Sequence, residues 1–200
     1  MTISAAILAG GKNARMGRKN KAFLEMDGRS FLARTLESLR PIFDEIMVIG
    51  HDVEGYGRFE VPVHPDLRPG NGSLGGILTA LARSSGERTF CVACDMPFLS
   101  PAIVRRLVEK SAAGWEAVLP RLSMGVEPLC AVYSTSLIPV IEGLLDSGER
   151  RVRRALDESR TCYVEEEELR LLDPDLLTFV NINTPDDLTR ASAMKEGART

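Results

Sequence analysis

The chain has 200 residues, of which 44% are apolar, 26% charged and 6% aromatic, a composition that excludes a disordered or collagen-like protein. Its 25 Lys and Arg residues against 28 Asp and Glu residues leave a net charge of −3, which argues against a dedicated nucleic-acid-binding protein. Because no apolar stretch approaches the roughly 20 residues of a membrane span, we expect no membrane partner and a cytosolic location.

The chain repeats an order of strand, loop and helix. Apolar and β-branched runs predict strands over residues 2–8, 45–50, 59–63, 89–94, 116–120, 129–133 and 179–183. Helical spacing predicts helices over residues 30–39, 73–81, 101–110, 136–145 and 151–158. Ser30 and Ser73 are the expected caps of the first two helices, and Thr184 is expected to cap a last helix that has Pro185 at its first position.

The strands are rich in Val, Ile and Cys without alternation, which is typical of strands buried on both faces. This predicts a three-layer, Rossmann-like α/β fold with a mostly parallel central sheet. No linker or repeat divides the chain, so we expect one domain over residues 1–200 with a frayed tail at residues 194–200. In such sheets ligands bind beyond the carboxyl ends of the strands, so we expect the chemistry in the loops after Leu8, Gly50, Val63 and Cys94.

The four cysteines are expected to be reduced and mostly buried in the core. Cys91 and Cys94 have the C-x-x-C spacing of zinc and redox sites, but both lie in a predicted strand. Residues three apart on a strand point to opposite faces, so these two thiols are not expected to share a metal ion or a disulfide.

The first strand is followed by a loop, residues 8–21, in which three glycines bracket five cations. Glycines let backbone N–H groups close around phosphate oxygens, and the cations neutralise the charge. The spacing is neither G-x-x-x-x-G-K-[ST] nor G-x-G-x-x-G. The sequence therefore favours a phosphate-binding loop, with a solvated basic loop or a nucleic-acid patch as the alternatives.

Two further loops have the composition of an anion site and a metal site. Residues 64–76 form a glycine-rich turn that leads into a helix, whose free N–H groups favour anions. The alternative is a flexible loop before a capped helix. Asp95 follows a buried strand directly, and a carboxylate there suits Mg²⁺, which is usually held by one or two carboxylates and by phosphate oxygens. The alternative role for Asp95 is a turn residue before Pro101.

Five segments resemble motifs of one enzyme family. Residues 8–21 resemble the L-A-[AG]-G-x-x-x-R-[MF]-G-x-x-K signature of nucleotidyltransferases, which join an NTP to a phosphorylated acceptor. Residues 66–76 resemble the D-x-x-x-G-x-G-P-L-[AG]-G element of the molybdenum cofactor guanylyltransferases, with Ser73 in place of the proline. The other matches are C-D-x-P-[FL] at residues 94–98, E-P-L-x-A-x-Y at residues 127–133 and F-x-N-[IV]-N-T-P-[ED]-D-L at residues 179–188.

The resemblance implies a nucleotidyltransferase fold and a set of site residues. The residues implied in catalysis are Arg15, Lys21 and Asp95, of which Asp95 would hold the metal ion, Mg²⁺. The residues implied in GTP binding are Leu8, Ala9, Gly10, Gly11, Lys21, Asp66 and Asp95. The residues implied on the acceptor side are Glu127, Asn181 and Asn183, although capping of the last helix is an equally good role for the two asparagines.

The implied reaction transfers GMP from GTP to the terminal phosphate of molybdopterin or the molybdenum cofactor, with release of pyrophosphate. Further implied partners are other cofactor-biosynthesis proteins or recipient oxidoreductases, in transient contact. A cytidylyltransferase acting on the same cofactor or on another small phosphorylated acceptor is the nearest alternative. Gly10 favours a purine over it, because relatives that use cytidine nucleotides tend to carry alanine there. A non-catalytic nucleotide- or cofactor-binding chaperone is the alternative from another class.

Three features lie outside these motifs. The cations Arg150, Arg151, Arg153 and Arg154 open a predicted helix and indicate either an anionic partner or, preferably, a solvated face. The acidic run at residues 165–168 is expected on the surface. His51 follows a strand and could contact a ribose.

Overall fold

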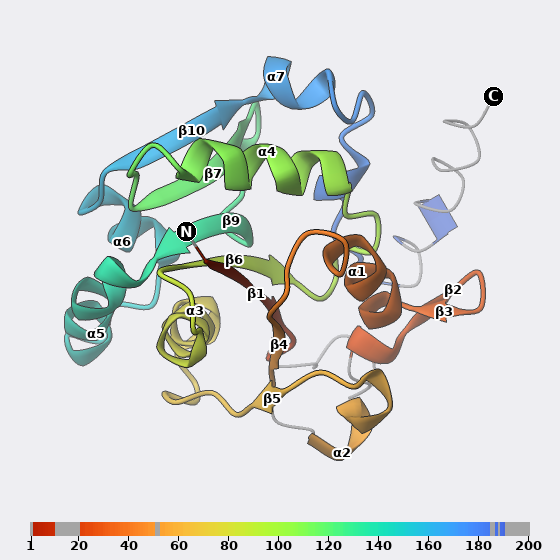
Figure 1. Ribbon diagram of the computed structural model, residues 1–200, viewed down its shortest axis with the longest axis horizontal. Coiled ribbons are helices and arrows are strands. Elements are labelled where there is room, and N and C mark those ends of the chain that lie inside the picture. Colours follow the sequence, from red (N-terminus) through yellow and green to blue (C-terminus); the bar gives the residue numbers. More distant parts are fainter. Residues whose placement is uncertain (1, 11–20, 51–52, 185–186, 188, 191–200) are drawn as a thin grey trace.

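The computed structural model of the chain describes residues 2–10, 21–50, 53–184, 187, 189 and 190 (Figure 1). Gly11, Arg15, His51 and Pro185 lie outside the described residues, as does the tail at residues 194–200. None of the helices in this described part of the chain combines the length and the apolar character that a membrane span requires.

Eight strands form the main sheet, in the order β10-β7-β9-β6-β1-β4-β5, with β8 paired to β7. The strands are β1 (Ile3–Leu8), β4 (Ile46–Ile49), β5 (Val63–His64), β6 (Arg88–Ala93), β7 (Ala117–Leu122), β8 (Gly125–Val126), β9 (Cys130–Ser134) and β10 (Thr161–Glu165). Strand β9 runs antiparallel to both of its neighbours and β8 runs antiparallel to β7, whereas the other pairs are parallel. The predicted mostly parallel sheet is confirmed.

Helices cover both faces of this sheet (Figure 1). The helices are α1 (Phe31–Leu39), α2 (Val53–Tyr56), α3 (Gly72–Arg83), α4 (Pro101–Ser111), α5 (Ile138–Asp146), α6 (Val152–Asp157) and α7 (Glu166–Arg170). Short 3-10 helices are η1 (Lys21–Phe23), η2 (Gly57–Phe59), η3 (Thr135–Leu137) and η4 (Leu177–Phe179), and β2 (Glu25–Met26) pairs with β3 (Arg29–Ser30). Helices α1 and α4 pack on one face, and α3, α5 and α6 pack on the other.

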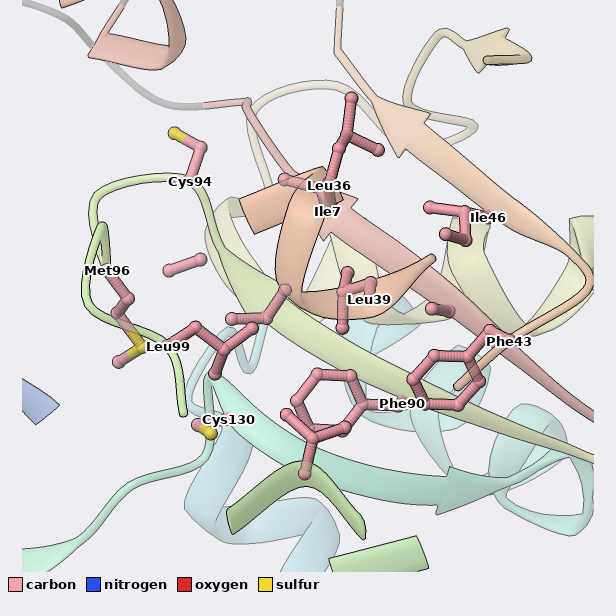
Figure 2. Packing of buried hydrophobic residues seen from close by; sticks show 14 of the residues in the cluster. Ile7, Leu36, Leu39, Phe43, Ile46, Phe90, Cys94, Met96, Leu99 and Cys130 are labelled. Carbon is pink, nitrogen blue, oxygen red and sulfur yellow. The ribbon is translucent and has the colours of Figure 1, made fainter. Parts of the chain in front are cut away.

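The burial of β1 shows why the sheet needs helices on both sides. Ala5 and Ile7 belong to the apolar cluster under α1 and α4, whereas Ala6 and Leu8 belong to the cluster under α3 and α5. Successive side chains of a strand alternate between the faces, so a strand that is buried on both faces must be covered twice. Figure 2 shows the first of these clusters, in which the centroids of the Phe43 and Phe90 rings lie 5.8 Å apart.

The cysteines follow the same alternation. Cys91 packs under α3 and α5, whereas Cys94 packs in the opposite cluster, where Figure 2 also shows Cys130. All four thiols are free, and Cys91, Cys94 and Cys130 are buried. The prediction of reduced, mostly buried cysteines is confirmed.

Two of the predicted strands are wrong. In place of the strand predicted over residues 59–63, η2 ends at Phe59 and the pairing is confined to Val63–His64. The backbone of Glu60 is left-handed, with φ 55°, which interrupts an extended chain. The strand predicted over residues 179–183 is not formed, because Ile182 is buried with Met26 and Phe31 in a separate small cluster rather than paired in the sheet.

The longest of the described strands that the sequence did not predict is β10, which pairs in parallel with β7 at the edge of the sheet. Its side chains are mostly half-buried, so its apolar signal is weak. The acidic run begins at the end of this strand and continues into α7, where Glu168 forms ion pairs with Arg106 and Lys110 of α4. The run is therefore at the surface, as predicted, and it also ties α7 to α4.

Two of the predicted caps are confirmed and one is displaced. Ala33 N–H donates to Ser30 Oγ over 3.2 Å at the start of α1. Asp187 N–H donates to Thr184 Oγ1 over 3.1 Å, and Thr184 N–H donates back to Asp187 Oδ2 over 2.9 Å. Helix α3 begins at Gly72 with Asn71 as its N-cap residue, so Ser73 lies in the first turn instead of capping it.

The carboxylate of Glu45, at the amino-terminal edge of the sheet, makes the stability of the fold pH-dependent. Burial raises the pKa of Glu45, but hydrogen bonds from the Ser4 hydroxyl and from the Ser85 N–H and hydroxyl outweigh this and lower it. A lowered folded-state pKa stabilises the protein above the ordinary glutamate pKa of about 4.3, and this contribution is lost as the pH falls through the folded-state value. We expect Glu45→Gln to melt at a lower temperature than the wild type at pH 7, and the gap to narrow below about pH 4. Equal gaps in melting scans at both pH values would contradict this role.

Candidate active site

A cavity of about 620 Å³ opens at the carboxyl-terminal edge of the sheet. It is lined by Leu8, Ala9, Gly10, Lys21, Ile49, Gly50, Asp66, Gly70, Gly72, Ser73, Gly76, Ala93, Cys94, Asp95 and Leu129. These residues come from the ends of β1, β4 and β6, from the loop between β5 and α3, from the first turns of α3, from the start of η1 and from the residue before β9. The expected location of the site, beyond the carboxyl ends of these strands, agrees with this cavity.

Three segments that are distant in sequence meet at one end of this cavity. Lys21 Nζ lies 2.9 Å from Asp95 Oδ2 and donates to Asn183 Oδ1 over 2.6 Å. The side chains of Lys21 and Asp95 are each 19% exposed, so the ion pair is largely shielded but still reachable from the cavity. Asp95 O accepts a hydrogen bond of 3.0 Å from Ile182 N–H, which fixes the segment that carries Asn183 beside the end of β6.

The oxygens around Lys21 fit a hard divalent cation. Asp95 Oδ2 and Asn183 Oδ1 converge on one positively charged atom, and carboxylate and amide oxygens are the ligands that Mg²⁺ prefers. Within the described ranges, no group of three or more His, Cys, Asp or Glu side chains could hold a metal ion by itself. A cation at Asp95 would therefore need further oxygens from a bound polyphosphate and from water, which is the usual arrangement for Mg²⁺.

The opposite wall of the cavity is the loop between β5 and α3. Gly70 and Gly72 have φ values of 84° and 61°, a conformation that side chains with a Cβ rarely adopt. The loop delivers Gly72 and Ser73, in the first turn of α3, to the cavity wall. The N–H groups of a first turn have no partner inside the helix, and the helix dipole adds partial positive charge there. This end of the cavity is therefore suited to phosphate oxygens.

The backbone at the end of β1 is only partly available to a ligand. Leu8 O accepts a hydrogen bond from Cys94 N–H over 3.2 Å, and Ala9 N–H donates to Ile49 O over 2.9 Å. These two groups therefore belong to the sheet. A Cβ added at Gly10 would meet only Ile49 O, at 4.0 Å, among the described residues. Within the part of the chain that the structure describes, neither packing nor a positive φ requires glycine at this position, and Gly10 lines the cavity.

Glu127 and Asn181 lie beside the Lys21–Asp95 pair. Burial raises the pKa of Glu127, and the charge of Asp95 raises it further, whereas hydrogen bonds from Leu129 N–H and the Asn181 side chain act to lower it. The bond from Leu129 N–H to Glu127 Oε1 is 3.0 Å long and holds a tight turn whose Leu129 lines the cavity. The structure thus brings both residues to the edge that carries Asp95.

Two of the four arginines at the start of α6, Arg151 and Arg154, form ion pairs with neighbouring carboxylates. Glu149 Oε2 lies 2.5 Å from Arg151 and 4.0 Å from Arg154, which also pairs with Asp157 over 3.2 Å. The side-chain and backbone hydrogen bonds of Arg151 lower the pKa of Glu149 to about 2. All four arginines of the cluster are exposed, which agrees with the preferred interpretation of a solvated face.

Sequence reasoning missed one polar residue behind the cavity wall, Thr79. Its hydroxyl donates to Asp66 Oδ1 over 3.0 Å. Thr79 stands in the middle of an apolar helical stretch, where a threonine is ordinarily a tolerated core residue, so the local sequence did not indicate this contact.

Fold and site together define the class of the protein. A mostly parallel α/β sheet whose carboxyl edge joins a helix N-terminus, a glycine-bearing loop and a Lys–Asp pair has the architecture of a nucleotide-binding transferase. Residues 5–161 match the MobA-like NTP transferase domain, and the chain belongs to this family of nucleotidyltransferases.

Relatives of known name support this assignment. Over 197 residues the chain is 34% identical to the molybdenum cofactor guanylyltransferase of Desulfosudis oleivorans, a match that covers 98% of each chain. The crystal structure of molybdopterin-guanine dinucleotide biosynthesis protein A from Archaeoglobus fulgidus superposes with a TM-score of 0.84 at 31% identity, covering 97% of this chain and 99% of that one. The 2-C-methyl-D-erythritol 4-phosphate cytidylyltransferase of Thermus thermophilus superposes with a TM-score of 0.71 over 98% of this chain and 100% of its own, but at 20% identity it shows the fold alone. The resemblance drawn from the motifs is confirmed.

Proposed function

We propose that the protein transfers GMP from GTP to the terminal phosphate of molybdopterin or the molybdenum cofactor and releases pyrophosphate. The observation that carries the proposal is the pairing of Lys21 Nζ with Asp95 Oδ2 over 2.9 Å inside the cavity that the first turn of α3 also lines. This arrangement offers a cation site and an anion site within one cavity, which is what a metal-bound triphosphate requires. The named guanylyltransferase relative supports guanine as the base.

In the proposed reaction an oxygen of the acceptor phosphate attacks the α-phosphorus of GTP in line. A new P–O bond to the acceptor forms as the bond between the α-phosphorus and the β-phosphate oxygen breaks, and pyrophosphate leaves. The acceptor phosphate is already ionised at pH 7, so no general base is needed. The protein contributes mainly positioning and neutralisation of charge.

The described residues divide this work between them. Asp95 and Asn183 would hold Mg²⁺, which supplies neutralisation of the phosphate charge. Lys21 would leave these two oxygens and balance the charge that builds on the α-phosphoryl group. Arg15, which lies outside the described residues, is proposed to hold the leaving pyrophosphate. Glu127 and Asn181 would face the acceptor.

Gly10 and Asp66 are proposed to contact the nucleoside. The Gly10→Ala variant is expected to fold as the wild type does, because among the described residues the nearest neighbour that a methyl group there would meet is Ile49 O, at 4.0 Å. We expect it to bind GTP about tenfold more weakly and CTP less affected, since the methyl group occupies space that the larger base needs. Fluorescence titration with GTP and CTP measures this. Gly143→Ala is the control, because a Cβ at Gly143 would meet none of the described residues within 4 Å, and Gly143 lies on α5, outside the cavity. Unchanged GTP affinity in Gly10→Ala would show that the base lies elsewhere.

The reaction itself is tested by a mass spectrum of the product. The protein is incubated with Mg²⁺, the cofactor and each of GTP, CTP, ATP and UTP in turn, and we expect a guanine dinucleotide only. A cytosine dinucleotide alone would establish the cytidylyltransferase alternative. Binding of GTP without any pyrophosphate release would instead establish a non-catalytic carrier.

A further inference from the structure

A buried hydroxyl on α3 holds the loop that forms the wall of the cavity. Thr79 is 0% exposed, and its Oγ1 accepts a hydrogen bond of 3.0 Å from Leu67 N–H. The same oxygen lies 3.0 Å from Asp66 Oδ1 and 2.9 Å from Gly75 O. A threonine hydroxyl has a single proton, and an ionised carboxylate is the stronger of the two acceptors. The hydroxyl is thus placed to bind the Asp66 carboxylate from inside the protein.

The two oxygens of Asp66 have different surroundings. Oδ1 also accepts from Arg68 N–H over 2.9 Å, so with Thr79 both of its lone pairs are used. Oδ2 forms no hydrogen bond within the described part of the chain and lies beside α3, where a Cβ added at Gly75 would come within 3.3 Å of it. Because Asp66 lines the cavity, Oδ2 is the oxygen that remains for a ligand.

We propose that Thr79 is a positioning residue for nucleotide selection. By holding Oδ1 it orients Asp66 so that Oδ2 accepts one hydrogen bond from the nucleoside part of the bound NTP. The donor is an N–H of the base or a hydroxyl of the ribose, since both are neutral donors that a single carboxylate oxygen can accept from. This inference rests on the proposed binding of GTP in this cavity.

The test is an analysis of Thr79→Val with nucleotide analogues. We expect Thr79→Val to bind GTP about tenfold more weakly than the wild type and Thr79→Ser to restore the affinity. The analogues each remove one donor: inosine triphosphate the exocyclic amino group, 1-methyl-GTP the N1–H, and 2′-deoxy-GTP and 3′-deoxy-GTP the ribose hydroxyls. One analogue lacks the donor whose hydrogen bond Asp66 accepts. The affinities of the wild type and of Thr79→Val for that analogue are expected to agree within about twofold.

Thr35→Val is the matched control, because Thr35 is also fully buried and donates to a backbone carbonyl, Phe31 O, over 3.0 Å on α1, away from the cavity. It should leave GTP affinity unchanged. Wild-type affinity in Thr79→Val, or the same loss for GTP and every analogue, would overturn the inference. If Asp66→Asn weakens GTP binding while Thr79→Val does not, the inference alone fails. If the wild type binds no GTP at all, the proposed function is wrong, and so is the inference that rests on it.

Discussion

Replacement of Asp95 with asparagine is expected to lower kcat for pyrophosphate release on the order of a thousandfold. The amide keeps the shape and the hydrogen bond that Lys21 Nζ makes over 2.9 Å, but it removes the negative charge that a divalent cation needs. The measurement is pyrophosphate release from GTP and cofactor at saturating Mg²⁺, together with a thermal melt.

The control for Asp95→Asn is Asp44→Asn. Asp44 is exposed just before β4, so it lies at the opposite edge of the sheet, and its replacement removes the same charge far from the cavity. We expect wild-type turnover from Asp44→Asn. An Asp95→Asn protein that melts normally and turns over at the wild-type rate would exclude Asp95 from metal binding.

Replacement of Lys21 with methionine is expected to reduce kcat/KM by about 100- to 1000-fold, because the site loses the cation proposed to balance charge on the α-phosphoryl group. The same variant should bind a divalent metal ion more tightly, although its turnover falls. Without nucleotide, the Lys21 ammonium occupies the position where Asp95 and Asn183 converge, so it competes with a divalent cation for these oxygens. We therefore expect Lys21→Met to bind Mn²⁺ alone about tenfold more tightly than the wild type.

Electron paramagnetic resonance of free Mn²⁺ measures this affinity independently of turnover. Lys110→Met is the control, because Lys110 pairs with Glu168 over 3.5 Å, and neither residue lines the cavity. Equal Mn²⁺ affinity in the wild type and Lys21→Met would show that Lys21 does not compete with the cation. A wild-type kcat/KM in Lys21→Met would show that Lys21 has no role in the reaction.

Local sequence patterns were sufficient for most of the fold. The helix over residues 30–39 was predicted with its cap at Ser30, because apolar spacing and a capping side chain act within one turn of the chain. The failures occurred where tertiary contacts override local preference. Residues 179–183 have the composition of a strand, yet Ile182 is buried against Met26 and Phe31, and no strand forms there. The half-buried strand β10 pairs with β7, although its own sequence carries little apolar signal.

The sequence by itself determined the fold class, the family and the edge of the sheet where the site lies, because these depend on periodicity and on motifs of adjacent residues. Only the tertiary structure decided which side chains meet. Lys21 is 74 residues from Asp95 and 162 from Asn183 in the sequence, and no local pattern predicts that its ammonium group donates to both. The same holds for Asp66. Which of its two carboxylate oxygens remains for a ligand depends on the hydroxyl of Thr79, which is 13 residues away in the sequence. Hydrogen-bond geometry is a property of the folded backbone, so these contacts become visible only once the chain has folded.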